Sequence, residues 1–249
     1  TVIVNASECE PYITSDHRIL LEEPEAVLGG VKLLARIFGV DRVHIAIEQN
    51  KSNAAGMLKL KIEEEKAPAV VDVLPTRYPQ GAEKQLCQSI TGRQVPPGAL
   101  PAAIGCAVFN VVTTAAIYNA VYHGKPVTHR VVTVSGSGVN EPKNLLCPIG
   151  TPIGDLLDAC GGVKQQTFKI LMGGPMMGHA QFDMTAPIGK GTNAILAFAD
   201  KEERTVEHPA CIRCGKCISV CPMRLQPVFL YQYEAAGMLP ELEAAHVMD

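Results

Sequence analysis

Short apolar runs alternate with amphipathic stretches through the first half of the chain, and this alternation constrains the fold more than any other feature. Strands are predicted over residues 2–5, 43–47, 70–74 and 106–109, and helices over residues 24–38, 53–65, 81–90 and 114–122. Apolar strands separated by helices usually pair in parallel, with helices covering both faces of the sheet. We therefore predict an α/β domain over residues 1–126, with any ligand bound beyond the carboxyl ends of its strands.

The pattern changes after residue 126. Strands are predicted over residues 130–134 and 167–172, and a short helix over residues 153–159. Gly136-Ser137-Gly138 resembles the start of a dinucleotide fingerprint, but Glu141 stands where the third glycine belongs, so a hairpin turn is predicted instead. Residues 173–178, GGPMMG, are predicted to form a turn with buried methionines, and secondarily a phosphate-cradling loop. This order of elements is typical of a small β-grasp domain over residues 127–200.

The third part of the chain, residues 205–249, carries four closely spaced cysteines followed by a proline. Cys211, Cys214, Cys217 and Cys221 have the spacing of bacterial-type ferredoxins, C-x2-C-x2-C-x3-C-P. In two-cluster ferredoxins the first three ligate one 4Fe–4S cluster and the fourth ligates the other. No second motif occurs in this sequence. We therefore expect a ferredoxin-type segment whose three thiolates alone do not hold an intact cluster, with weak packing after Cys211.

Zinc and disulfides are the competing interpretations of these four cysteines. Structural zinc usually takes two cysteine pairs a dozen or more residues apart, which four cysteines within residues 211–221 fit poorly. A disulfide framework requires an oxidising compartment, and no signal peptide is visible. The remaining cysteines are predicted to be small buried side chains in a reducing cytosol. They are Cys9, Cys87, Cys106, Cys147 and Cys160.

The composition argues against two classes of partner. The net charge is −3, tryptophan is absent and only 5% of the residues are aromatic. This composition does not predict the basic surface or the aromatic stacking residues that bind nucleic acid. Residues 102–121 carry no charge and are long enough to cross a bilayer, but glycine, asparagine and threonine interrupt them. A strand, a turn and a helix explain this stretch better. We expect a protein that is soluble, or peripheral to a membrane.

Three polar loops follow predicted strands. The first, residues 5–11, carries two carboxylates; the second, residues 78–84, places a glycine at a helix N-terminus; the third, residues 110–114, leads into another helix. Each loop alone is explained by helix capping or turn formation. Because all three fall at the carboxyl ends of one predicted parallel sheet, a shared ligand site is also predicted.

The same loops carry a resemblance to a known family. NASECEP and YPQGAEKQL resemble segments of the NADH-binding flavoprotein subunit of respiratory complex I, and Asn110 and Thr113 match a third segment of that family. Together with GGPMMG and CIRCGKC, the sequence most resembles the C subunits of Rnf electron-transport complexes. The resemblance extends over essentially the whole chain.

The resemblance implies that FMN lies over the sheet with NAD(H) stacked on it. The implied flavin shell is Asn5, Glu8, Gly81, Glu83, Asn110 and Thr113. Glu10 and Glu83 would lie nearest the nicotinamide. Three positions depart from the family pattern, namely Ser7, Ala82 and Phe109, while Lys84 adds a charge that could offset a phosphate. The family's glycine-rich phosphate loop would lie upstream of Thr1, as expected for a chain that opens directly on a strand.

The implied function is an NADH:ferredoxin oxidoreductase component of a translocase-type complex. It would exchange hydride between NAD(H) and FMN and pass single electrons to 4Fe–4S clusters, two of them in the full-length protein. Its partners would be the other subunits of a membrane complex and ferredoxin. The protein would lie at the cytoplasmic face of the inner membrane. Two alternatives stay open: a cobalamin reductase of the propanediol-utilisation type, and a non-catalytic electron wire with a scaffold α/β domain.

Overall fold

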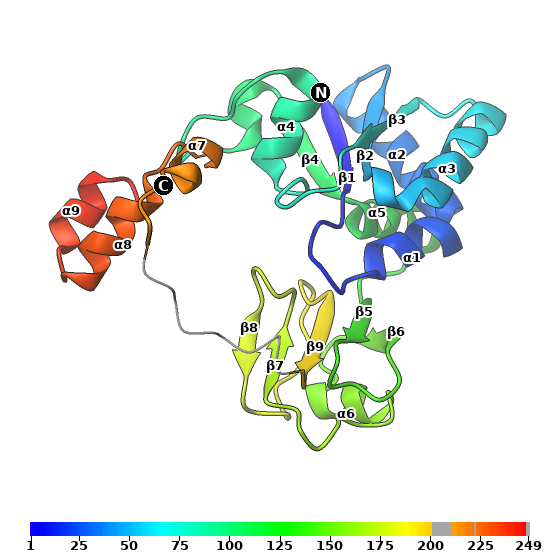
Figure 1. The fold of residues 1–249 in the computed structure, drawn as a ribbon. Helices are drawn as coiled ribbons and strands as arrows, with labels where there is room; N and C mark the ends of the chain where they lie inside the picture. Colours follow the sequence, from blue (N-terminus) through cyan, green and yellow to red (C-terminus); the bar gives the residue numbers. More distant parts are fainter. Residues whose placement is uncertain (201–210, 222, 248–249) are drawn as a thin grey trace. The chain divides into compact units, whose positions relative to one another are not determined.

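The computed structural model of the chain describes residues 1–200, 211–221 and 223–247 (Figure 1). It divides into two compact units, Thr1–Glu203 and Arg204–Asp249. The first unit contains two sheets, each with its own apolar core.

A parallel sheet of order β3-β2-β1-β4 forms the first half of this unit. Its strands are β1 (Val2–Ala6), β2 (Val43–Glu48), β3 (Ala69–Leu74) and β4 (Ala107–Asn110). Val4 at its centre pairs with Ile45 on one side and Phe109 on the other. The predicted α/β fold is therefore confirmed, and the strand bounds differ from prediction by one or two residues.

Helices cover both faces of the parallel sheet, as the apolar strands require. Val2, Val4 and Ala6 pack on the face covered by α2 (Pro24–Phe38), α3 (Ser52–Glu65) and α5 (Val111–His123). Ile3 and Ala46 pack on the opposite face, against α4 (Glu83–Thr91). Helices α2 and α5 approach each other closely at Gly30. A Cβ at this position would lie only 2.0 Å from the carbonyl oxygen of Thr114. Short 3-10 turns occur at Gln49–Lys51 (η1) and Pro101–Ile104 (η2).

One helix of this domain, α1 (Ser15–Glu22), is absent from the sequence prediction. Its residues Ser15 and Asp16 are buried although they are polar, so the helix has no simple apolar stripe. Tertiary contacts described below explain why these two side chains point inward.

The second sheet has the order β6-β5-β9-β7-β8. Its strands are β5 (His129–Ser135), β6 (Lys143–Pro148), β7 (Lys169–Met172), β8 (His179–Gln181) and β9 (Ala194–Phe198), with helix α6 (Ile153–Asp158) packed against them. β5 and β6 pair antiparallel, so the hairpin predicted at Gly136-Ser137-Gly138 is confirmed. The prediction of buried methionines between β7 and β8 is wrong, because Met176 is 55% exposed and Met177 is 72% exposed. Their turn projects from the sheet instead of folding over its core.

The second unit is helical, with α7 (Lys216–Val220), α8 (Pro227–Ala235) and α9 (Leu239–Ala244). Among the described residues of this unit, Leu242 is the only apolar side chain classed as buried. This agrees with the weak packing expected after Cys211.

In the described part of the chain, no helix has the length and apolar character needed to cross a membrane. Residues 102–121 fold into η2, β4 and most of α5, as predicted.

Candidate functional site

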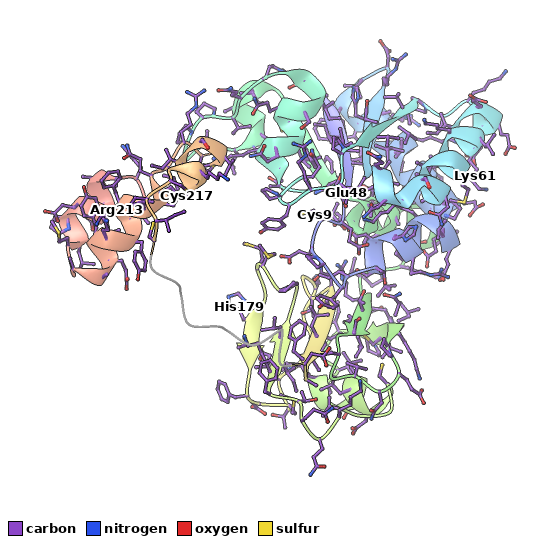
Figure 2. All side chains as sticks on the ribbon, viewed as in Figure 1. Cys9, Glu48, Lys61, His179, Arg213 and Cys217 are labelled. Atoms are coloured by element: carbon purple, nitrogen blue, oxygen red, sulfur yellow. The ribbon has the colours of Figure 1, made fainter. Side chains whose placement is uncertain are left out.

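Polar side chains gather at the carboxyl ends of the parallel strands. Asn5 lies near the end of β1, Glu48 ends β2 and Asn110 ends β4. Parallel pairing brings these ends to one edge of the sheet, and Figure 2 shows Cys9, from the loop after β1, close to Glu48 at that edge. The edge is therefore the candidate functional site.

The carboxylate of Glu8 is held by the N-terminus of α1. Its Oε1 accepts hydrogen bonds from the backbone N–H of Asp16 (2.8 Å) and from the hydroxyl of Ser15 (3.3 Å), and Oε2 accepts from the N–H of His17 (3.4 Å). Burial, together with the negative charge of Asp16, raises the pKa of Glu8 to about 7. The site therefore contains a carboxyl group that titrates near neutral pH.

Asp16 lies behind Glu8 and fixes the orientation of Asn110. The Nδ2 of Asn110 donates to Asp16 Oδ2 at 2.7 Å, while its Oδ1 accepts from the N–H of Val112 at 2.9 Å and so caps α5. Burial raises the pKa of Asp16, although the hydrogen bond from Asn110 and the charge of Arg130 oppose that shift. Asn110 is thus held at both ends of its amide, which leaves one N–H available to a ligand.

A buried lysine completes this cluster. Lys51 Nζ donates to Glu48 Oε2 at 3.0 Å and to the backbone carbonyl of Glu8 at 3.2 Å. Lys51 and Glu48 are both buried, and Glu48 Oε1 has no hydrogen-bond partner in the described structure. Sequence reasoning missed both Lys51 and Asp16. An acid directly after Ser15 was the only signal for the helix start, and nothing in the sequence marked Lys51 as buried.

The loop before α4 touches the loop after β1. Asn5 Nδ2 donates to the carbonyl of Gly81 at 2.8 Å, and the N–H of Ser7 donates to Asn5 Oδ1 at 3.0 Å. A Cβ on Gly81 would lie only 2.3 Å from the carbonyl oxygen of Ser7, so this contact requires glycine. Glu83, in the first turn of α4, is exposed.

The carboxylate of Glu10 contacts the second sheet. Its Oε2 accepts from the backbone N–H of Met176 at 3.0 Å, in the turn between β7 and β8. Its Oε1 is buried and has no hydrogen-bond partner in the described structure. A buried carboxylate oxygen without a partner is costly, so this atom is an acceptor for which a ligand can supply the donor.

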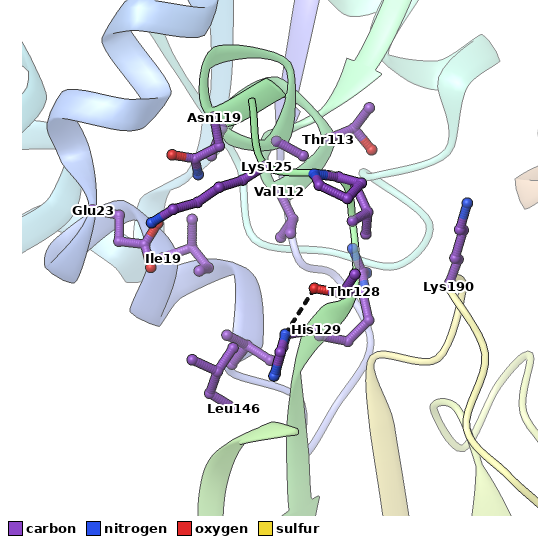
Figure 3. Close-up of a pocket in the computed structure, with 16 residues that line it drawn as sticks. Ile19, Glu23, Val112, Thr113, Asn119, Lys125, Thr128, His129, Leu146 and Lys190 are labelled. Carbon is purple, nitrogen blue, oxygen red and sulfur yellow. Dashed lines mark hydrogen bonds between the residues drawn. The ribbon is translucent and has the colours of Figure 1, made fainter. Parts of the chain in front are cut away.

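Three of the predicted site residues, Glu8, Glu10 and Thr113, line one or the other of two cavities. The smaller, about 410 Å³, is lined by Glu8, Cys9, Glu10, Lys51 and Tyr78, among others. The larger, about 750 Å³, is lined by Thr113 and Asn119 of α5 and by Lys125, His129 and Lys190 (Figure 3). Glu8 and Glu10 therefore share a cavity, whereas Thr113 faces the other one.

The four cysteines of the second unit are free thiols. Cys211, Cys214 and Cys217 are exposed and Cys221 is half-buried. The N–H of Arg213, a residue in the left-handed region (φ 56°), donates to Cys211 Sγ at 3.4 Å. Across the described residues, no group of three histidine, cysteine or acidic side chains is placed to hold a metal ion. The donors match an iron–sulfur cluster in kind, and hydrogen bonds to the sulfurs are typical of such sites.

Comparison with known proteins supports the sequence interpretation. Residues 1–119 match the Nuo51 FMN-binding domain family and residues 131–180 match the SLBB domain family. The chain is 46% identical over 92% of its length to the C subunit of the proton-translocating ferredoxin:NAD(+) oxidoreductase complex of Clostridium ljungdahlii. It is 40% identical over its full length to the Na(+)-translocating counterpart of Acetobacterium woodii. The resemblance to these C subunits that the sequence predicted is confirmed.

The chain spans about half the length of these curated relatives, covering 50% and 56% of them respectively. Among solved structures, it resembles an NAD+-reducing NiFe-hydrogenase in the H2-reduced state, with a TM-score of 0.67 and 21% identity. That match covers 79% of this chain and 40% of the hydrogenase chain. At this identity the likeness concerns the fold alone, and it agrees with a Nuo51-type domain followed by an SLBB domain.

Proposed function

We infer that the chain is the flavin- and nicotinamide-binding part of a C subunit of an ion-translocating ferredoxin:NAD(+) oxidoreductase complex. The observation that carries this proposal is the cluster of Asn5, Glu8 and Asn110 at the carboxyl edge of a sheet that matches the Nuo51 FMN-binding domain family. The relatives named above are subunits of such complexes.

The residues at this edge fit a flavin. Asn110 has one amide N–H left for a ligand, Gly81 brings backbone close to the site, and Glu83 is exposed, whereas Thr113 lines the larger cavity. A flavin ring offers both donors and acceptors for such groups. When bound, FMN supplies hydride uptake and one-electron release, and the protein supplies position and electrostatics. Asn5, Glu8, Gly81, Glu83, Asn110 and Thr113 are our proposed flavin ligands.

Glu10 fits the nicotinamide part of NAD(H). Glu10 lines the 410 Å³ cavity together with Glu8 and Tyr78, and its buried Oε1 has no hydrogen-bond partner in the described structure. The carboxamide of nicotinamide carries an NH2 group that can donate to such an oxygen. Glu10 would thereby orient the ring that gives or takes hydride, while Glu8, with its pKa of about 7, can hold a proton at the same edge.

We propose that Cys211, Cys214 and Cys217 ligate one 4Fe–4S cluster, with Cys221 directed to a second. The spacing and the free, accessible thiols support this assignment. Electrons would then leave the flavin one at a time for these clusters and for ferredoxin. The partners would be the other subunits of a membrane-associated complex, with the chain peripheral on the cytoplasmic face of the inner membrane.

The flavin assignment is tested in the full-length protein by substituting two asparagines, Asn110 at the N-cap of α5 and Asn119 within the helix. Asn110→Ser keeps a capping oxygen but removes the amide donor, so the cap of α5 is retained. Loss of a hydrogen bond of this kind should weaken FMN binding about tenfold, or roughly 1.4 kcal/mol. Asn119→Ser, on the wall of the larger cavity, is the matched control and should leave FMN affinity unchanged. Equal affinity in Asn110→Ser and the parent, or a loss confined to Asn119→Ser, would place the flavin elsewhere.

A further inference from the structure

The loop that carries Glu10 is fastened to the second sheet. Ile13 is buried in a cluster with Leu171 of β7 and Leu196 of β9. The rings of Tyr12 and Phe198 meet edge to face at 5.4 Å, and the N–H of Thr14 donates to Thr133 Oγ1 at 3.1 Å. The second sheet therefore holds this loop of the parallel-sheet domain in place.

The turn between β7 and β8 is built around the Glu10 carboxylate. A Cβ on Gly174 would lie 2.2 Å from Glu10 Oε2 and 2.8 Å from its Cβ, so glycine is required there by the approach of Glu10. A Cβ on Gly178 would lie 2.4 Å from the carbonyl oxygen of Gly174, and Gly173 has a φ of +100°. The hairpin pairing of Met172 with His179 involves no atom of Glu10. The glycine at position 174 is thus explained by Glu10, which lies far away in the sequence.

The contact with the turn also determines which carboxylate oxygen of Glu10 is left without a hydrogen bond. Met176 donates its N–H to Oε2, and Oε1 is left buried without a partner in the described structure, on a residue that lines the 410 Å³ cavity. If the turn withdrew, both oxygens could rotate and solvate, and the acceptor would lose its fixed direction. Met176 and Met177 are exposed on the same turn, and flexible thioether side chains pack well against flat rings.

We propose that the Gly173–Gly178 turn of the second sheet is part of the nicotinamide site, where it positions Glu10 and so sets the affinity for NAD(H). This inference rests on the proposed function of the edge cluster. It assigns the SLBB-type domain a role in dinucleotide binding, with Gly174 as a positioning residue that acts through Glu10.

The test uses two glycine substitutions in the flavin-loaded full-length protein. Gly174→Ala should displace the Glu10 carboxylate and raise the Kd for NADH about tenfold, with flavin content unchanged. Gly189→Ala is the matched control in the same domain, because its Cβ would meet no atom within 4 Å. It should bind NADH like the parent. Normal NADH affinity in Gly174→Ala overturns the proposal.

A double-mutant cycle separates positioning from a general loss of structure. In a Glu10→Gly background the Oε2, Cδ and Cβ atoms that collide with the new Cβ are all gone, so Gly174→Ala should change the Kd for NADH less than twofold. Equal losses in both backgrounds would show that Gly174 does not act through Glu10, and would overturn the proposal.

Hydrogen exchange on the unmutated protein provides a readout that needs no variant to fold. NADH should slow exchange of the amides of residues 173–178, and Met176 above all. Unchanged exchange there, in a protein that does bind FMN and NADH, contradicts this inference and leaves the proposed function standing. A full-length protein that binds neither FMN nor NADH would instead contradict the proposed function itself.

Discussion

The two units of the chain differ sharply in how much apolar side chain they bury. In the first unit, Leu28 and Ile45 are fully buried at the centre of a continuous core. In the second, Phe229 is 43% exposed and Tyr231 is 61% exposed, and Leu242 alone among its described apolar side chains is buried. The first unit can therefore fold by apolar burial, whereas the second lacks a core of comparable size.

Because of this difference, we expect the cofactors proposed for the two units to have different effects on folding. A unit with so small an apolar core usually needs a metal, disulfides or a partner to fold, and metal binding is then coupled to folding. We expect a cluster to order residues 211–247, whereas FMN would bind to a first unit that is already folded.

The largest expected effect is on the metal site. In the full-length protein, Cys217→Ala should remove about half of the bound iron under anaerobic reconstitution, since one of the two clusters would lose one of its three ligands from this chain. Iron and sulfide assays measure this directly. The control is Cys160→Ala, at a buried thiol of the first unit, which should keep its iron. Full iron content in Cys217→Ala, with normal cluster spectra, would rule out the proposed ligand set.

The next effect concerns stability in the metal-free protein. Leu28→Ala should cost about 2–5 kcal/mol in the free energy of unfolding, because it opens a cavity in the core of the first unit. Phe229→Ala should change it by less than about 0.5 kcal/mol, since exposed side chains contribute little. Chemical denaturation followed by circular dichroism measures both. Similar costs at the two positions would remove the contrast between the units.

A smaller effect is expected from Asp16, which holds Asn110. Asp16→Ala should weaken FMN binding about fivefold to tenfold, because Asn110 loses the partner that fixes its amide. Asp158→Ala, at an exposed position at the end of α6, is the control and should bind FMN like the parent. Fluorescence titration of FMN gives both affinities. If Asp16→Ala binds FMN normally, the hydrogen bond to Asn110 serves the fold and not the ligand.

A pH dependence of stability is also expected in the first unit. Burial, with the charge of Asp16 and against that of Lys51, raises the pKa of Glu8 from 4.5 to about 7. The folded state thus binds this proton more tightly than the unfolded chain. The stabilisation is complete below about pH 4.5 and is lost as the pH rises through about 7. Its size should be on the order of 1–3 kcal/mol.

Unfolding free energies of the parent and Glu8→Gln between pH 5 and pH 8 test this dependence. The parent should lose stability over that range, and Glu8→Gln should lose less of it. The slope that remains would come from Asp16, whose pKa is raised in the same direction. Identical slopes in the two proteins would show that Glu8 titrates at its ordinary pKa.

The sequence predicted the parallel sheet because apolar strands and helical spacing are local patterns. It also placed Asn5, Glu8 and Asn110 at one edge, since parallel pairing brings strand ends together. It could not predict α1, whose buried Ser15 and Asp16 point inward only because Glu8 and Asn110 lie there. Such polar burial is a tertiary property that no periodicity in the sequence reveals.

The turn at residues 173–178 was misjudged for a related reason. Methionines that follow a predicted strand usually belong to a core, and nothing local indicates that this turn projects towards Glu10. The contact spans two domains of one unit, so it depends on how β7 and the loop after β1 meet. Likewise, the sequence pattern could not show that Thr113 faces a different cavity from Glu8 and Glu10.

The most direct test of the account is hydrogen exchange of the full-length protein with and without FMN. We predict that FMN slows exchange in residues 5–10, 78–83 and 110–113, and leaves residues 211–247 unchanged. That result would place the flavin at the carboxyl edge of the parallel sheet in an already folded unit. Protection confined to residues 125–131 on the larger cavity, or to residues 211–247, would contradict it.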